Sequence, residues 1–226
     1  MAVSTDTVKG RLYQSIARVA QALAHGNRLQ LLEWIAQGER SVDALAAMSG
    51  MTVANTSQHL QALRQAGLVA ARKDGQRVYY SIAGDDVLAL FADLRRVAEG
   101  RVAEVEKLVR DFIGHRDDLE AIAGRELLER AKKGLVTVLD VRPPEEYAAG
   151  HVSGAVNVPL DRLESYLGKL PRKREVVAYC RGPYCLMSFE AVLKLRKRGW
   201  KARRLENGFP EWKAAGLPVA SGAKSR

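Results

Sequence analysis

The chain has 226 residues, 47% of them hydrophobic and 27% charged, which suits two globular domains of about 100 residues each. Its net charge of +10 favours a polyanionic partner, nucleic acid first. No run approaches the roughly 18 apolar residues of a membrane helix, and no secretion signal opens the chain. Two cysteines make no disulfide framework. We expect a cytoplasmic protein with no membrane partner.

The first half carries short amphipathic patterns. Apolar spacing and glycine stops predict helices over residues 7–24, 28–38, 41–50 and 52–67. The expected N-caps of the last three are Asn27, Ser41 and Thr52. The Asp-Gly pair in "LVAARKDGQRVYYSI", 68–82, predicts a β-hairpin. Two short helices, a tight turn and a hairpin are typical of a winged helix-turn-helix.

The helix over 52–67 would enter the DNA major groove by its first turns. Its polar side chains could bond base edges or phosphates: Asn55, Thr56, Ser57, Gln58, His59 and Gln61. Its buried face would hold Val53, Leu60 and Leu63. Basic residues of the hairpin would lie beside the DNA backbone: Arg72, Lys73 and Arg77. The alternative is a solvated polar helix beside an ordinary hairpin.

A long apolar stripe follows the hairpin, from Asp85 to about Gly114, and predicts one long helix. An isolated stripe of this length needs a partner surface. A second copy of the chain is the economical partner, because dimers are the commonest oligomers. We therefore expect a homodimer formed through the first and fifth helices.

Three segments, "ALAHGNRLQLLEWI", "SVDALAAMSGMTVANTSQHLQALRQAGLV" and "KDGQRVYYSI", resemble the ArsR/SmtB family of bacterial repressors across residues 18–82. The resemblance implies a homodimer that binds a palindromic double-stranded DNA operator until an inducer arrives. Metal-sensing members carry cysteines around the third helix, but residues 1–179 contain none. The family's other metal site uses Asp and His of the last helix, where Asp85 and Asp86 lie at the opposite end from His115. We therefore expect no metal and no cofactor.

The second half alternates apolar strands with helices. Strands are expected at 135–142, 154–159, 174–180 and 201–208, with a helix over 188–200. This alternation predicts a parallel sheet with helices on its faces. We predict two domains: a mostly helical winged helix-turn-helix with a β-hairpin wing over 1–116, and an α/β domain with a parallel central sheet over 117–226.

The two cysteines lie in "YCRGPYC", between a buried strand and a helix beginning near Leu186. At such a junction backbone N–H groups converge and the helix N-terminus adds positive potential. A thiol at Cys180 would have a lowered pKa and act as a nucleophile. Arg181 would add charge and Gly182 would relieve crowding. Buried core thiols remain an alternative for Cys180 and Cys185, whereas a zinc clip lacks two ligands.

The segments "VLDVRPPEEYAAGHVSGAVNVPL", "YCRGPYC" and "ENGFPEWKAAGLPV" resemble a single rhodanese domain over residues 122–219. The resemblance implies that Cys180 accepts sulfane sulfur from a donor such as thiosulfate and passes it on. The loop has the six positions associated with sulfur transfer. We expect Asp140 and Arg142 to support the loop, and Glu146 and His151 to fix the following turn.

Many active members of this family end the loop with arginine, where this chain has Cys185. Losing that cation should weaken binding of a dianionic donor. The second thiol could attack a Cys180 persulfide and form a disulfide or a longer sulfur bridge.

Our leading hypothesis is a DNA-binding repressor whose rhodanese domain senses reactive sulfur, with thiosulfate, polysulfide or persulfide as donor. One alternative is a sulfurtransferase enzyme tethered to DNA by its first domain. Another is a sensor of arsenite or a similar thiophilic metalloid that uses Cys180 and Cys185.

Overall fold

The computed structural model describes residues 7–113 and 121–222, and the chain forms two compact units, Met1–Val87 and Leu88–Arg226. The predicted domain boundary at 116/117 lies outside the described residues. Our predicted first domain included the two helices α5 (Asp85–Arg101) and α6 (Ala103–Ile113). All of α6, and α5 after Val87, fall in the second unit. No helix in the described ranges is long and apolar enough to cross a membrane.

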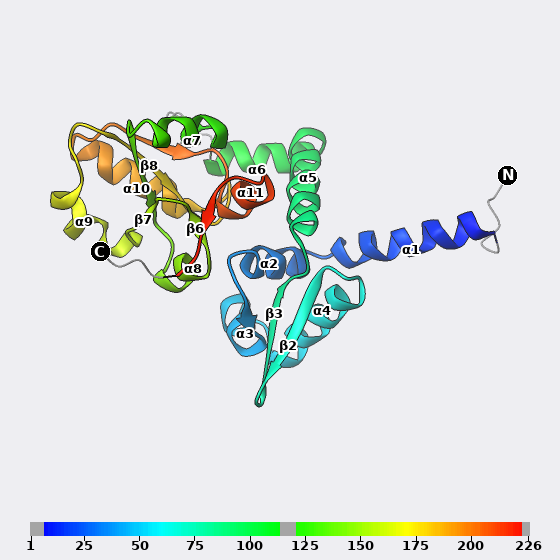
Figure 1. The fold of residues 1–226 in the computed structure, drawn as a ribbon. Coiled ribbons are helices and arrows are strands. Elements are labelled where there is room, and N and C mark those ends of the chain that lie inside the picture. Colours follow the sequence, from blue (N-terminus) through cyan, green and yellow to red (C-terminus); the bar gives the residue numbers. More distant parts are fainter. Residues whose placement is uncertain (1–6, 114–120, 223–226) are drawn as a thin grey trace. The chain divides into compact units, whose positions relative to one another are not determined.

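The first unit contains four helices among its described residues and a small antiparallel sheet of strand order β1-β3-β2 (Figure 1). In chain order its elements are α1 (Val8–Leu23), α2 (Gly26–Ile35), β1 (Arg40–Ser41), α3 (Val42–Ser49), α4 (Val53–Gln65), β2 (Val69–Asp74) and β3 (Arg77–Ile82). The β2–β3 hairpin projects beyond α3 and α4 (Figure 1). Buried leucines from α2, α3 and α4 form the core of this unit. The predicted winged helix-turn-helix is confirmed.

Two of the three predicted N-caps are confirmed. The side chain of Ser41 accepts the N–H of Ala44, and Thr52 accepts that of Asn55, each at 3.2 Å. The prediction for Asn27 is wrong. Helix α2 begins earlier, because His25 has the extended backbone of a cap and its Nδ1 accepts the Asn27 N–H at 3.2 Å.

The single long helix predicted after the hairpin is also wrong, since α5 and α6 are separate helices with a break at Val102. Gly100 lies two residues before the break. A glycine inside a helix costs about 1 kcal/mol relative to alanine, which makes this a weak point of the helix. The apolar stripe therefore belongs to two helices.

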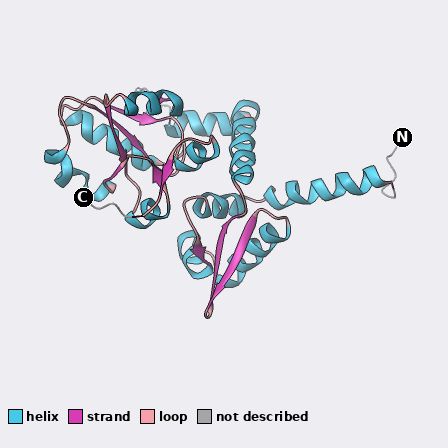
Figure 2. Ribbon diagram, in the orientation of Figure 1, coloured by secondary structure: helices cyan, strands magenta, loops and turns pink. Residues whose placement is uncertain are grey.

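The second unit is built on a five-stranded, all-parallel sheet of order β4-β9-β8-β5-β7, which confirms the predicted fold class. Figure 2 shows its strands among helices. The sheet strands are β4 (Ala121–Ile122), β5 (Val136–Asp140), β7 (Val156–Asn157), β8 (Glu175–Tyr179) and β9 (Ala202–Leu205). The α-helices after α6 are α7 (Gly124–Lys132), α8 (Pro144–Ala149), α9 (Leu163–Tyr166), α10 (Leu186–Lys197) and α11 (Phe209–Ala214). A separate ladder pairs β6 (His151–Val152) with β10 (Val219–Ala220).

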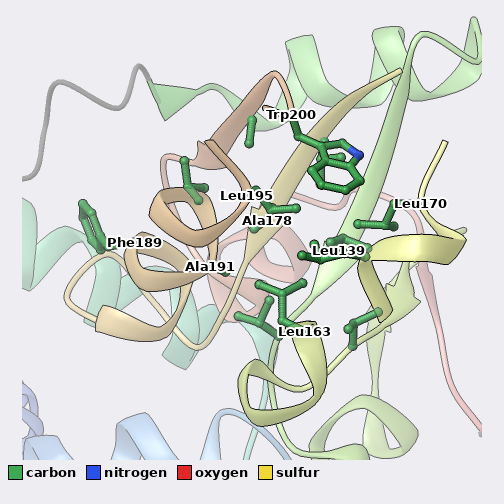
Figure 3. Packing of buried hydrophobic residues seen from close by; sticks show 14 of the residues in the cluster. Leu139, Leu163, Leu170, Ala178, Phe189, Ala191, Leu195 and Trp200 are labelled. Carbon is green, nitrogen blue, oxygen red and sulfur yellow. The ribbon is translucent and has the colours of Figure 1, made fainter. Parts of the chain in front are cut away.

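Successive strand residues point to opposite sides of the parallel sheet, and the residues on both sides are buried. From β8, Val176 and Ala178 join one core cluster, and Val177 and Tyr179 join the other. In the first cluster, helix α10 packs against the sheet (Figure 3). The alternation continues past the strand, so that Cys180 lies on the α10 side.

The strand order places the site. The chain leaves β5 toward β7 on one side and leaves β8 toward β9 on the other, so β5 and β8 flank a topological switch point. Ligands of open α/β sheets bind outside the carboxyl ends of strands at such points. The register pairs Asp140 with Tyr179, so the residues after β5 and β8 start from the same edge.

Candidate functional site

The loop from Cys180 to Cys185 closes back on itself. Cys180 follows β8 and is 1% exposed, and Cys185 is the N-cap of α10 and is half-buried. The Sγ of Cys180 donates to the carbonyl of Cys185 at 3.3 Å and to the Oγ of Ser188 at 3.4 Å. The structure therefore brings the two predicted sulfur residues together.

The predicted lowering of the Cys180 pKa is wrong for this arrangement. Burial raises the pKa of the Cys180 thiol well above its ordinary value, and the hydrogen bond with Cys185 and the negative charge of that neighbour raise it further. The side chain of Cys180 points into the core between the sheet and α10, because it continues the alternation of Val176 and Ala178 in β8.

The lowered pKa belongs to Cys185. A hydrogen bond from Cys180 is the main cause that brings the pKa of Cys185 down to about 7, against the opposing effect of burial. The backbone N–H groups of Met187 and Arg181 and the Arg181 guanidinium also favour the anion. The Cys185 side chain makes no N-cap hydrogen bond to α10, so these amides act on the thiolate through electrostatic attraction.

Arg181 is held by Glu146 rather than pointing freely at the thiols. Its Nε and Nη2 donate to the Glu146 carboxylate at 2.7 to 3.1 Å. Glu146 is 2% exposed and comes from α8. Glu146 therefore anchors the cysteine loop, whereas the sequence predicts only that it fixes the following turn. His151 does contact that turn, with Nδ1 2.8 Å from the Tyr147 carbonyl oxygen.

Asp140 and Arg142 form the floor beneath the loop, as a buried ion pair. The Nη2 of Arg142 donates to Asp140 Oδ2 at 2.6 Å and to the Gly150 carbonyl at 2.7 Å. The Tyr179 hydroxyl donates to the same Asp140 oxygen at 2.5 Å, just before Cys180. Both charged side chains are fully buried. They tie the ends of β5 and β8 together and do not reach the thiols by any described hydrogen bond.

Gly208 allows the closest backbone approach beside the loop. A Cβ at Gly208 would lie 2.4 Å from the carbonyl carbon of Arg181 and from the amide nitrogen of Gly182. The neighbouring Phe209 N–H donates to the Cys180 carbonyl at 3.1 Å. The sequence does not predict Gly208 as a site residue, although it lies in the segment "ENGFPEWKAAGLPV".

Helix α5 contacts the cysteine loop within the second unit. The Tyr184 hydroxyl donates to the Glu99 carboxylate, and Arg95 pairs with Glu211 of α11. These side chains line a pocket of about 440 Å³ that also contains Pro183 of the loop. No sequence motif signalled this contact, because its partners are more than 80 residues apart.

Most of the predicted base-reading residues lie on the outer side of α4. Asn55, Gln58 and Gln61 are exposed, and Ser57 and His59 are half-buried. Two predictions about this helix are wrong. Thr56 is fully buried and its Oγ1 donates to the Thr52 carbonyl at 2.9 Å, which removes it from any DNA-facing surface. Val53, expected in the core, is 50% exposed.

The basic residues of the hairpin are exposed, but they differ in what they contact. Arg72 donates to both oxygens of Glu39, at 2.8 and 3.2 Å, and to Asp74 at 3.1 Å. Lys73 and Arg77 are fully on the surface. On α4, the ring of His59 lies 4.5 Å from that of His25. Partial burial, and then the positive charges of His25 and Arg28, lower the pKa of His59.

The described part of the chain contains no group of three or more His, Cys, Asp and Glu side chains able to hold a metal ion. Asp85 and Asp86 start helix α5. His115, the histidine considered with these two aspartates as a possible metal ligand, lies outside the described residues.

Comparison with known proteins matches both halves of the chain. The family described as "Bacterial regulatory protein, arsR family" matches residues 25–71, and "Rhodanese-like domain" matches residues 124–215. The HTH-type transcriptional regulator Rv0324 of Mycobacterium tuberculosis is 48% identical over 215 residues, 95% of this chain and 94% of that protein.

Two further proteins each match one half. A solution structure of a homodimeric winged helix-turn-helix DNA-binding domain from Mycobacterium bovis is 49% identical, covering 45% of this chain and 94% of that one, with a TM-score of 0.40. A sulfurtransferase of Allochromatium vinosum is 30% identical over 87 residues, 38% of this chain and 79% of its own. Because one relative shares 48% identity across 95% of the chain, the protein belongs to the arsR family of bacterial transcriptional regulators and carries a C-terminal rhodanese-like domain.

Proposed function

We propose that this regulator represses transcription as a homodimer on a double-stranded DNA operator, and that the Cys180–Cys185 loop senses reactive sulfur. One observation carries the sensing role: two free thiols, linked by the hydrogen bond from Cys180 Sγ to the Cys185 carbonyl, share a six-position loop at the switch point of a rhodanese-like unit. The protein works in the cytoplasm, where its DNA is and where other thiols stay reduced.

The sulfur step is a nucleophilic displacement. A loop thiolate attacks the sulfane sulfur of thiosulfate, a polysulfide or a persulfide, and a new S–S bond forms to the cysteine. The donor's remaining part leaves as sulfite, a shorter polysulfide or a thiolate. The loop amides and the N-terminus of α10 stabilise the resulting persulfide anion.

Exposed apolar side chains support a homodimer through the first and fifth helices. On α1, Val8, Leu12 and Ile16 are 56 to 84% exposed, and α1 extends beyond the other helices of its unit (Figure 1). On α5, Leu94 and Val97 are also exposed. Covering such patches is a common reason for association.

Helix α5 offers a route from the thiols to the dimer. Phe91, Arg95 and Glu99 follow one stripe of the helix, and the last two contact Glu211 and Tyr184 of the same unit. The exposed apolar stripe lies about 100° further around the same helix. A sulfur adduct that moves Tyr184 would therefore shift a helix that also forms the dimer interface, which is the differential contact that coupling requires.

The second candidate is a sulfurtransferase enzyme that the first unit carries to DNA. The six-position loop and the likeness to a named sulfurtransferase favour it. It differs from the sensor in one respect: sulfur would be passed to an external thiol or cyanide without changing DNA affinity.

Fluorescence anisotropy with DNA from upstream of the regulator's own gene tests these functions. The sensor predicts that inorganic polysulfide releases the reduced protein from DNA and that dithiothreitol restores binding. The matched control is the double variant Cys180→Ser and Cys185→Ser, which should stay bound. Unchanged binding together with turnover of thiosulfate and cyanide would support the enzyme. Release by arsenite alone would support a metalloid sensor.

A further inference from the structure

A basic surface lies on the second unit, at the edge of the parallel sheet away from the cysteine loop. Cys180 follows the carboxyl end of β8, whereas Lys173 and Arg174 precede its amino end and Lys201 precedes that of β9. The two strands are parallel neighbours and are paired from the start of β9, so their amino ends lie at one edge. All three of these basic residues are exposed.

The end of helix α10 adds further cations to the same edge. Because β9 runs parallel to β8, the helix that connects them ends where β9 begins. The Nη1 of Arg172 donates to the Arg198 carbonyl at 2.9 Å, and the guanidinium carbon of Arg172 lies 3.5 Å from the centre of the Trp200 ring. These contacts join the two segments into one surface. We call this surface the basic edge, and its exposed cations are Arg172, Lys173, Arg174, Lys197, Arg198 and Lys201.

Few carboxylates balance the basic edge. Arg198 pairs with Glu164 at 3.1 Å, and both side chains are largely exposed. Glu175, the residue after Arg174, is already paired with Arg130 at 2.6 Å. Within residues 7–113 and 121–222, no ion pair involves Lys173, Arg174, Lys197 or Lys201. The positive charge of the basic edge is therefore available to a partner or to counterions from solution.

We propose that the basic edge is a second DNA-binding surface, which contacts the phosphates of the duplex beside the operator. Residues 117–226 hold 21 of the 36 Lys and Arg residues and 14 of the 26 Asp and Glu residues, so most of the excess positive charge lies outside the predicted DNA-reading domain. Cations that reach phosphates release counterions without reading the base sequence. The inference goes beyond sulfur sensing and rests on the proposed operator binding by the first unit.

Duplex DNA is the polyanion that the first unit would bring within reach. Once that unit is bound to its operator, the second unit is tethered to the neighbouring duplex at a high effective concentration, so weak phosphate contacts add to the affinity. The contact leaves the cysteine loop uncovered, because the loop follows the carboxyl end of β8. A sulfur donor therefore reaches the loop without displacing the basic edge from DNA.

The test compares two triple variants of the full chain that lose the same charge. The edge variant neutralises three cations of the basic edge: Lys173→Gln, Arg174→Gln and Lys201→Gln. The matched control neutralises three exposed cations that follow β4, β7 and β9 at the carboxyl edge of the sheet: Arg125→Gln, Arg162→Gln and Lys213→Gln. Lys197 and Arg198 are left unchanged, because cations at the end of α10 also stabilise that helix.

Fluorescence anisotropy measures binding to two labelled duplexes from upstream of the regulator's own gene. One is trimmed to the palindromic operator, and the other keeps two more helical turns on each side, about 20 base pairs. We expect wild type and the control to bind the longer duplex more tightly than the shorter one, with a steeper fall of log K against log salt. The edge variant should lose that gain, and its slope on the longer duplex should be shallower by about 2 or more.

Equal affinities and slopes for the edge variant and the control on the longer duplex would overturn the inference. Co-sedimentation of wild type, but not of the edge variant, with phosphatidylglycerol vesicles, together with unchanged DNA binding, would instead assign the basic edge to anionic lipid. If wild type showed no preference for the palindrome over a random duplex, the proposed operator binding would be refuted. A loss of random-duplex binding in the edge variant alone would still support the surface. Thermal unfolding of both variants excludes misfolding, and Lys173→Gln alone provides a milder change if the triple variant does not fold.

Discussion

The hydroxyl of Tyr184, in the loop between the two cysteines, donates a hydrogen bond to the carboxylate of Glu99 in helix α5. The guanidinium of Arg95 lies 5.9 Å from the same ring and pairs with Glu211. The cysteine loop is thus attached to the helix that follows the wing. Sequence motifs put the loop and that helix in separate domains, whereas their contacts put them in one unit.

Tyr184→Phe should weaken the link between sulfur chemistry and DNA release. The variant keeps the ring and loses the hydroxyl that bonds Glu99. Sulfur loading should stay close to wild type, while the polysulfide concentration needed for half-release from DNA rises several-fold. Loading is measured by mass and release by anisotropy. Tyr166→Phe is the control, since it removes a hydroxyl from α9; an equal effect there, or none in Tyr184→Phe, would refute the link.

The Cys185 thiolate should be visible near neutral pH. Thiolate absorbance at 240 nm in Cys180→Ser should rise with a midpoint near pH 7, the pKa of Cys185 in the native protein. The serine hydroxyl can still donate a hydrogen bond to the thiolate. Cys180→Ala removes the donor and should move the midpoint toward the ordinary value of about 8.5. Identical midpoints in the two variants would show that the hydrogen bond does not set the pKa.

The same shift makes stability depend on pH. The Cys185 pKa is lower in the folded state than in the unfolded state, so ionisation stabilises the fold above the unfolded-state pKa of about 8.5. That contribution, up to about 2 kcal/mol, is lost as the pH falls through about 7. Urea unfolding should show wild type gaining stability over Cys185→Ser between pH 6 and pH 9. A constant difference would contradict the lowered pKa.

Gly208→Ala should displace the cysteine loop. The added Cβ would lie 2.4 Å from backbone atoms of Arg181 and Gly182, and backbone cannot rotate away as a side chain can. We expect a loss of about 1–3 kcal/mol and slower sulfur loading. Gly168→Ala is the control, because no atom lies within 4 Å of the place its methyl group would take and its backbone is permissive. Equal loss in both variants would point to helix or turn effects instead of crowding.

Asp140→Asn should unfold the second unit more easily. The change leaves the Arg142 charge buried without its partner, which costs about 3–5 kcal/mol. Chemical unfolding followed at Trp200 and Trp212, both in this unit, should move to lower denaturant. Glu129→Gln breaks an exposed pair with Lys132 and should have almost no effect. An unchanged midpoint in Asp140→Asn would show that the pair is not needed for the fold.

Substitutions on α4 and on the hairpin should change DNA binding in different ways. Gln58→Ala changes an exposed residue of α4 and should lower affinity for the operator more than for random DNA. Arg77→Ala should weaken both and reduce the slope of log K against log salt by about 1. Arg72→Ala should have a smaller effect on that slope, since Arg72 is already paired with Glu39 and Asp74. Equal slopes for Arg72→Ala and Arg77→Ala would show that those pairs open on DNA.

Much of the fold could be read in the chain. Ser41 and Thr52 cap their helices where expected, since capping depends on a few neighbouring residues. The alternation of β8 and the motifs around Cys180 located a parallel sheet and the loop that carries both cysteines. Such features depend on residues that are close together in the sequence, so short stretches of sequence predict them.

Other properties depended on neighbours far along the chain. Which thiol has the lower pKa could not be read from "YCRGPYC", because the pKa of Cys180 depends mainly on its burial and also on Ser188, which lies outside that stretch. Thr56 turned inward because α4 packs on that side, although its residue type suits DNA. The contact between Tyr184 and Glu99 spans 85 residues. The sequence by itself determined the two families, two of the three predicted helix caps and the position of the loop that carries both cysteines. Only the tertiary structure decided the burial of the two cysteines, the opposite directions of their pKa shifts and the attachment of α5, because desolvation and long-range contacts exist only after the chain has packed.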